Sequence, residues 1–167
     1  MTRGSFRDAV ESYRYCLQYA PDTPGVMFSL GMATELDGQH KNALSIFSSL
    51  LARDPSSTAV LLRIAPNQLK LDIQDAALET FKRVLALDRA DSTALVAVGA
   101  IYGTKGDFPN AGEYSGKAIA ITPGAIRAHQ NLAIALLRMN RLEDASRAAD
   151  AGLAVEPQNA ILTSIKT

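Results

Sequence analysis

The sequence predicts an all-α fold, a solenoid of stacked helix-turn-helix units. Alanine recurs at a fixed spacing of 34 residues, at Ala9, Ala43, Ala77, Ala111 and Ala145. Proline recurs at the same spacing, at Pro21, Pro55, Pro123 and Pro157, and Arg89 occupies the one interrupted position. A fixed period of this length indicates one supersecondary unit repeated along the chain, each unit burying its apolar side against its neighbours.

The midpoint of each unit carries a residue suited to a helix end. These residues are Gly38, Asp72, Gly106 and Asn140. Glycine and asparagine readily adopt the left-handed backbone conformation that closes a helix, and aspartate tolerates it better than most residues. All four units are therefore predicted to turn at the same place.

The chain opens with a half unit over residues 5–23, which we predict as one helix over residues 5–20. Phe6, Val10, Tyr13 and Leu17 recur at helical spacing and form its apolar stripe. Cys16 is the single cysteine and is predicted to be a buried, inert thiol on the packing side of this helix. A lone cysteine excludes an internal disulfide framework.

Four full units follow over residues 24–57, 58–91, 92–125 and 126–159, and residues 160–167 begin a further or capping helix. In the first full unit the helices are predicted over residues 24–37 and 41–53. The second unit holds Pro66 inside its first helix, where proline removes a backbone hydrogen bond and predicts a kink. We interpret residues 1–167 as a single solenoid.

Small residues recur in the first helix of each unit, and we expect each to face the alanine twelve residues later. Gly31 and Gly99 are therefore expected to lie opposite Ala43 and Ala111. Gly112 and Gly116 lie in the second helix of the third unit. They indicate close helix packing, or alternatively a weak point for local opening.

The 34-residue pattern of Leu30-Gly31, Gly38, Ala43, Phe47 and Pro55 resembles the tetratricopeptide repeat. The resemblance covers nearly the whole chain and implies a right-handed α-solenoid that binds a partner protein. It also implies that the first helix of each unit lines a concave groove. The candidate groove residues on these helices are Phe28, Met32, Glu35, Leu62, Arg63, Pro66, Leu69, Val96, Arg127, Gln130, Asn131, Ile134 and Arg138.

These candidates do not all point to binding equally. Phe28 and Met32 lie four residues apart beyond the core stripe and favour binding. Leu62, Val96 and Ile134 fit packing between neighbouring helices as well as they fit binding. Each arginine is also readable as an ordinary solvated charge. Asn131 matches the asparagine with which some relatives hold a peptide backbone, whereas their carboxylate-clamping set of lysine and asparagine is absent.

Composition argues against several functions. Lysine plus arginine and aspartate plus glutamate number 17 each, so no net charge or basic stripe favours nucleic acid or an anionic membrane. His40 is predicted to be exposed at a turn and His129 to be a buried structural residue, so neither joins a catalytic or metal-binding set. We expect no enzyme activity, cofactor or metal. The lone cysteine and an N-terminus without an apolar core predict a cytoplasmic protein, with a periplasmic or membrane-associated location open for a fragment.

The resemblance therefore predicts a scaffold that binds a peptide or helical segment of another protein in its concave groove. Two alternatives remain open. One is self-assembly through the ends of the repeat array, where apolar side chains are expected to lack a neighbouring helix. These side chains are Phe6, Val10, Tyr13 and Leu17 at the start and Ala148, Ala151 and Val155 at the end. The other is a regulatory or substrate-recruiting domain of a larger enzyme.

Overall fold

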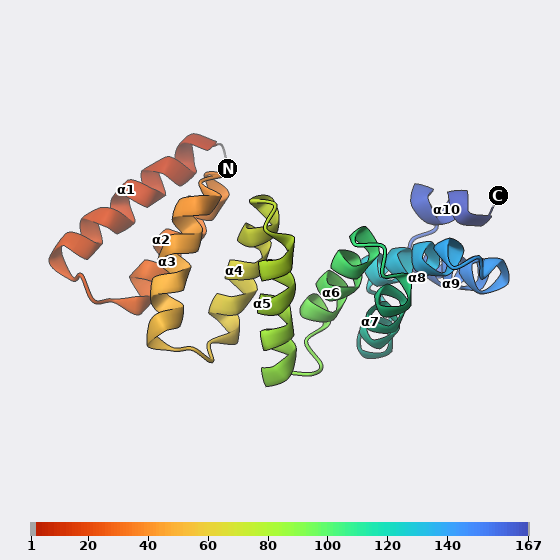
Figure 1. Cartoon of the computed structure of the whole chain (residues 1–167). Coiled ribbons are helices and arrows are strands. Elements are labelled where there is room, and N and C mark those ends of the chain that lie inside the picture. The colour runs from red at the N-terminus through yellow and green to blue at the C-terminus, as the bar shows by residue number, and fades with distance from the viewer. Residues whose placement is uncertain (1–2, 167) are drawn as a thin grey trace. The chain divides into compact units, whose positions relative to one another are not determined.

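The computed structural model describes residues 3–166, and Met1, Thr2 and Thr167 lie outside the described residues. Every regular element in this range is an α-helix (Figure 1). The helices are α1 (Arg3–Tyr19), α2 (Pro24–Leu36), α3 (His40–Arg53), α4 (Thr58–Lys70), α5 (Gln74–Leu87), α6 (Ser92–Thr104), α7 (Phe108–Ile121), α8 (Ile126–Arg138), α9 (Leu142–Val155) and α10 (Ala160–Lys166). The predicted all-α class and its helix-turn-helix repetition are confirmed.

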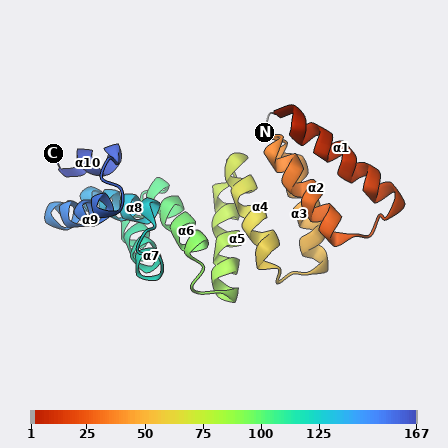
Figure 2. The same cartoon turned by 180° about the vertical axis from the view of Figure 1, so that it is seen from behind.

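The chain divides into two compact units, which we call the N-terminal unit (α1–α5, to Leu87) and the C-terminal unit (α6–α10, from Asp88). Within each unit, helices adjacent in sequence pack against each other as antiparallel neighbours (Figures 1 and 2). The predicted organisation as one solenoid over residues 1–167 stays a prediction.

The four predicted turns are confirmed in detail. Backbone φ is positive at each midpoint, with values of 83° for Gly38, 59° for Asp72, 79° for Gly106 and 58° for Asn140. At the first turn the Gly38 amide donates to the Glu35 carbonyl at 2.9 Å, and the Gln39 amide donates to the Thr34 carbonyl at 3.0 Å. The same two bonds recur at the other three midpoints. They satisfy carbonyls that the end of an α-helix leaves without partners.

Phe47 fills the centre of the N-terminal unit. Its side chain is 0% exposed, and it shares a buried cluster with Leu50, Val60 and Ile64. The cluster joins α3 to α4, and side chains of α2 cover its edge. Helix α4 continues through Pro66, because its buried face keeps the whole helix packed from Val60 to Asn67.

Gly31 lies against Phe47, whereas the sequence pattern predicts that it faces Ala43. A Cβ atom on Gly31 would come within 2.7 Å of the Phe47 ring. A Cβ atom on Gly99 would likewise come within 2.7 Å of the Ser115 hydroxyl, sixteen residues later, and would lie 3.3 Å from the carbonyl oxygen of Ala111, twelve residues later. The expected register of twelve residues is therefore wrong for the closest contact. Glycine is required at position 31 because a phenyl ring occupies the space of its side chain.

The apolar stripe of α1 is covered in part, so the prediction of an uncovered first helix is wrong for Val10, whereas Phe6, Tyr13 and Leu17 are half-buried. Val10 is buried against Leu30 and Ala33 of α2, and Tyr13 and Leu17 pack beside it. The stripe lies on one face, so α2 buries Val10 at its centre and leaves the flanking side chains half-buried.

The exposed side of α1 carries different residues. Tyr15 and Tyr19 are 60% and 75% exposed, and their rings lie 5.0 Å apart. Cys16 is exposed beside them, so its predicted burial is wrong. The cysteine lies about a quarter turn from the stripe that contacts α2, and a helix packed on one side only leaves that flank in solvent.

Helix α10 packs against α8 and α9 at the end of the C-terminal unit (Figure 2). Leu162 is fully buried there with Ala133, Ala145 and Ala149. Ala148 belongs to the same cluster, so the prediction that it awaits a successor is wrong. Ala151 and Val155 are exposed as that prediction requires.

Gly112 and Gly116 differ in their surroundings, although both lie inside α7. A Cβ atom on Gly116 would have nothing within 4 Å, so the close packing predicted there is wrong. We expect Gly116→Ala to stabilise the chain by about 0.5–1 kcal/mol, because alanine has the higher helix propensity and restricts the unfolded state. Urea denaturation measures the change. A destabilised variant would show that Gly116 is needed for backbone freedom or for contact with another molecule.

Candidate functional site

The two histidines have structural partners. His129 is buried, as predicted, and its Nε2–H donates to the Pro123 carbonyl at 2.8 Å. His40 is half-buried, which corrects the prediction of an exposed turn residue. It contacts Asn67 Oδ1 through Nδ1 at 2.9 Å, and Asn67 Nδ2 in turn donates to the Arg63 carbonyl at 2.8 Å. The bond to the Arg63 carbonyl fixes the orientation of the Asn67 amide, so its Oδ1 faces His40 and accepts a hydrogen bond from Nδ1–H. The bond ties α3 to α4.

The candidate groove residues of α2 are largely engaged in the fold. Phe28 and Met32 pack against the buried cluster around Phe47, and the rings of Phe28 and Phe47 meet edge to face at 5.6 Å. Glu35 pairs with Arg63 of α4 across 3.8 Å. Its second oxygen, Oε2, is buried without a hydrogen-bond partner among the described residues. Binding through these side chains remains a prediction.

On α4, the candidates Leu62, Arg63 and Pro66 are half-buried, and Leu69 is exposed. Leu62 and Pro66 therefore keep part of their surface available. The Arg63 guanidinium is held toward Glu35 on the neighbouring first helix. The N-terminal unit thus offers a modest apolar surface with one internally neutralised charge pair.

In the C-terminal unit, two polar candidates hold elements of the fold together. Asn131 Nδ2 donates to the carbonyl of Val96 at 3.3 Å, which links α8 to α6. Gln130 Nε2 donates to Asn159 Oδ1 at 3.0 Å, and the same oxygen accepts from the Leu162 amide at the start of α10. Val96 itself is half-buried. The Asn131 amide is therefore engaged with a carbonyl of this chain, and a contact from it to a peptide backbone is not shown.

The remaining candidates of α8 project outward. We define the α8 face by Arg127, Ile134, Leu137 and Arg138, which lie along one side of the helix at helical spacing. Ile134 and Leu137 are 36% and 39% exposed. Arg127 and Arg138 are exposed, and neither forms an ion pair with any acidic side chain in residues 5–166. Three of these four residues, Arg127, Ile134 and Arg138, are candidate groove residues predicted from the sequence.

A second feature was missed by the sequence analysis. A cleft of about 640 Å³ lies among α7, α8 and α9, with Leu132, Leu136 and Met139 in its lining. At its rim Arg141 Nε donates to Asp144 Oδ2 at 2.8 Å, and Arg147 binds the other oxygen of the same carboxylate. These two hydrogen bonds, first that of Arg147 and then that of Arg141, hold the pKa of Asp144 below its ordinary value of 3.8.

The histidine, cysteine, aspartate and glutamate side chains of the described residues form no group of three that is arranged to hold a metal ion. None of the helices between Arg3 and Lys166 combines the length and the apolar character needed to cross a bilayer.

Comparison with known sequences identifies the repeat. Two family models, both described as tetratricopeptide repeat, match residues 1–58 and 104–167. The human tetratricopeptide repeat protein 28 is 30% identical over 81 residues, which are 47% of this chain and 3% of that protein. The chain therefore spans a small fraction of the length of this relative.

Solved structures show the same fold. MamA from Desulfovibrio magneticus RS-1 matches with a TM-score of 0.84 and 22% identity, over 95% of this chain and 89% of that one. YrrB, described as a tetratricopeptide repeat protein with an unusual peptide-binding site, matches with a TM-score of 0.82 and 17% identity, over 98% and 84% of the two chains. Repeat period, turn geometry and both sets of matches agree: the chain belongs to the tetratricopeptide repeat family.

Proposed function

We propose that the protein is an interaction scaffold that binds an acidic, partly apolar segment of a partner protein along the α8 face. The fold suits protein–protein interaction in general, since repeats of this kind expose long helical surfaces. Support for a peptide as the ligand comes from YrrB, whose peptide-binding site is built on the same fold.

The proposal rests on the side chains of the α8 face that neither pack in the core nor pair with another residue. Six of the thirteen candidate groove residues already pack against the core, form an ion pair or make a hydrogen bond within the chain. On the α8 face, by contrast, Ile134 and Leu137 keep more than a third of their surface exposed. Arg127 and Arg138, at either end, remain without an acidic partner among the described side chains. Exposed aliphatic groups between two unpaired guanidinium groups favour a ligand with apolar and carboxylate side chains.

The dimensions of the α8 face set the size of that ligand. Eleven residues separate Arg127 from Arg138, which is about 16 Å along a helix with a rise of about 1.5 Å per residue. An extended segment of about five residues covers this length, as do about three turns of a helix. Carboxylates near both ends of the segment would reach both arginines, with the apolar side chains between them.

A peptide selection tests the proposal. A phage library of random 12-residue peptides is first depleted on the double variant Arg127→Glu/Arg138→Glu and then selected on the unmodified chain. We expect the recovered peptides to be enriched in aspartate, glutamate and large apolar residues. Their synthetic, fluorescently labelled forms then report affinity by polarisation.

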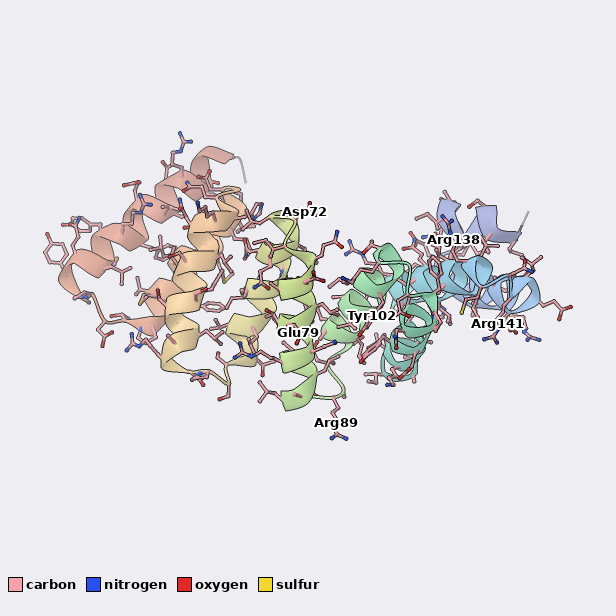
Figure 3. All side chains as sticks on the ribbon, viewed as in Figure 1. Asp72, Glu79, Arg89, Tyr102, Arg138 and Arg141 are labelled. Atoms are coloured by element: carbon pink, nitrogen blue, oxygen red, sulfur yellow. The ribbon has the colours of Figure 1, made fainter. Side chains whose placement is uncertain are left out.

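Matched variants decide whether binding depends on the α8 face. Ile134→Ser/Leu137→Ser should weaken binding about tenfold or more, because burial of one large aliphatic side chain contributes about 1.5–3 kcal/mol. Arg89→Glu is the control for the charge reversals at Arg127 and Arg138, since Arg89 projects into solvent from the segment before α6 (Figure 3). Recovery of no peptides, or of peptides whose affinity is unchanged by Ile134→Ser/Leu137→Ser, would contradict the proposal.

A further inference from the structure

The cleft among α7, α8 and α9 opens beside a repeat position that holds leucine in the first two full units and glycine in the third. Gly112 occupies the position that Leu44 and Leu78 hold 68 and 34 residues earlier. Leu78 is buried, and Leu44 packs against the cluster around Phe47. At the equivalent place in α7 no side chain is present, and the cleft opens there, with Gly112 in its lining. The part of the cleft beside Gly112 is therefore a position that leucine fills in the first two full units.

The walls of the cleft suit an aliphatic side chain. A Cβ atom on Gly112 would lie 3.7 Å from Leu132 Cδ1, 3.9 Å from Ala135 Cβ and 3.9 Å from Met139 Cε. These are ordinary van der Waals distances to methyl groups, so the surroundings accept more atoms without a clash. The cleft of about 640 Å³ is open to solvent, so an aliphatic side chain would occupy only the part beside Gly112.

The rim of the cleft carries balanced charges, with Arg141 and Arg147 on one side of the count and Glu113 and Asp144 on the other, but the guanidinium groups keep unused donors. Arg141 and Arg147 share the single carboxylate of Asp144. Glu113, on the α7 side, is already paired with Lys117 at 2.6 Å. The side chain of Arg147 is 76% exposed, and a guanidinium has more N–H donors than one shared carboxylate can accept. Asp144 thus holds two guanidinium groups beside the apolar lining of the cleft, which we call its apolar floor (Leu132, Leu136 and Met139). Their remaining N–H donors are available to a second carboxylate.

We propose that this cleft is a second binding site, which takes a leucine or methionine side chain of a partner protein with an aspartate or glutamate beside it. The aliphatic group fills the part of the cleft beside Gly112, and the adjacent carboxylate binds Arg147 and Arg141. The site differs from the α8 face, because Leu132, Leu136 and Met139 line it while Ile134 and Leu137 do not. The labelled Arg138 and Arg141 also point in different directions (Figure 3).

Methyl NMR of the whole chain tests this proposal with a defined probe, the N-acetylated and C-terminally amidated tetrapeptide of sequence glycine-aspartate-leucine-glycine. We expect titration to shift the methyl signals of Leu132, Leu136 and Met139, and to leave those of Ile134 and Leu137 in place. The same peptide with asparagine in place of aspartate should bind about tenfold more weakly, because a charge-assisted hydrogen bond is lost. Equal binding of the two peptides would overturn the role of the arginines.

Two substitutions on one helix form the critical comparison. Gly112→Leu introduces the leucine of the first two full units and should abolish the methyl shifts by occupying the part of the cleft beside α7. Gly116→Leu adds the same side chain to α7 where nothing lies within 4 Å, and it should leave binding intact. Equal binding to both variants would overturn the proposal.

A second variant covers the case in which Gly112→Leu disturbs the fold. Arg141→Gln/Arg147→Gln leaves the apolar floor unchanged and should weaken binding of the aspartate peptide about tenfold. Arg127→Glu/Arg138→Glu, which removes the charges of the α8 face, should leave the tetrapeptide affinity unchanged. Loss of binding in that variant alone would assign the tetrapeptide to the α8 face and overturn the cleft site without affecting the proposed function.

Discussion

Phe47→Ala is expected to destabilise the N-terminal unit by about 3–5 kcal/mol, which is the usual cost of deleting a buried aromatic side chain. Phe47 is fully buried and lies at the centre of the cluster with Leu50, Val60 and Ile64. Its ring also occupies the space in front of Gly31. Alanine would leave a cavity bordered by three helices, and helices held by one another's side chains cannot collapse fully into it.

Urea denaturation followed by circular dichroism measures this loss, and Phe47→Leu is the matched control. Leucine retains most of the apolar volume, so it should cost considerably less than alanine. A loss below about 1 kcal/mol for Phe47→Ala would mean that Phe47 is not central to the packing, since that is a surface-like value.

Gly152→Ala is expected to destabilise the C-terminal unit by about 1–3 kcal/mol through overpacking. The added Cβ atom would come closest to Leu162 Cδ1 of α10 and would lie 2.8 Å from His129 Cβ of α8. Leu162 is fully buried and His129 nearly so, and the His129 imidazole is also held by its bond to the Pro123 carbonyl. Neither neighbour has free space to move into, so α10 must shift away from α8 and α9.

Gly116→Ala is the control for this prediction, because it makes the same change inside another second helix. The two substitutions should move the free energy of unfolding in opposite directions, since helix propensity favours alanine at both positions and only position 152 meets a clash. Amide hydrogen exchange in α10 should accelerate in Gly152→Ala and stay unchanged in Gly116→Ala. A Gly152→Ala variant as stable as Gly116→Ala would contradict the described packing of α10.

The repeat and its turns were predictable from the sequence because both depend on local chemistry. Gly38, Asp72, Gly106 and Asn140 mark positions where the backbone must turn left-handed, and few residue types do this at low cost. The period of 34 residues then places every helix, because each unit repeats the same local pattern. All four turns have the backbone conformation expected from these residues.

For the candidate binding residues, the sequence predicted only that they lie on the first helix of each unit. The pattern placed thirteen residues on first helices, but it did not show which of them the fold itself uses. Asn131 is engaged with the Val96 carbonyl of α6, and Gln130 with Asn159. Such contacts join residues about 30 positions apart, so their partners are set by how the helices stack.

The sequence by itself determined the family and the order of the helices, because the same residue preferences recur every 34 residues. Only the tertiary structure decided which neighbour each side chain meets. It placed Phe47 against Gly31, exposed Cys16, and opened a cleft beside Gly112. The physical reason is that turn chemistry acts over a few residues, whereas burial depends on atoms contributed by helices that are distant in the chain.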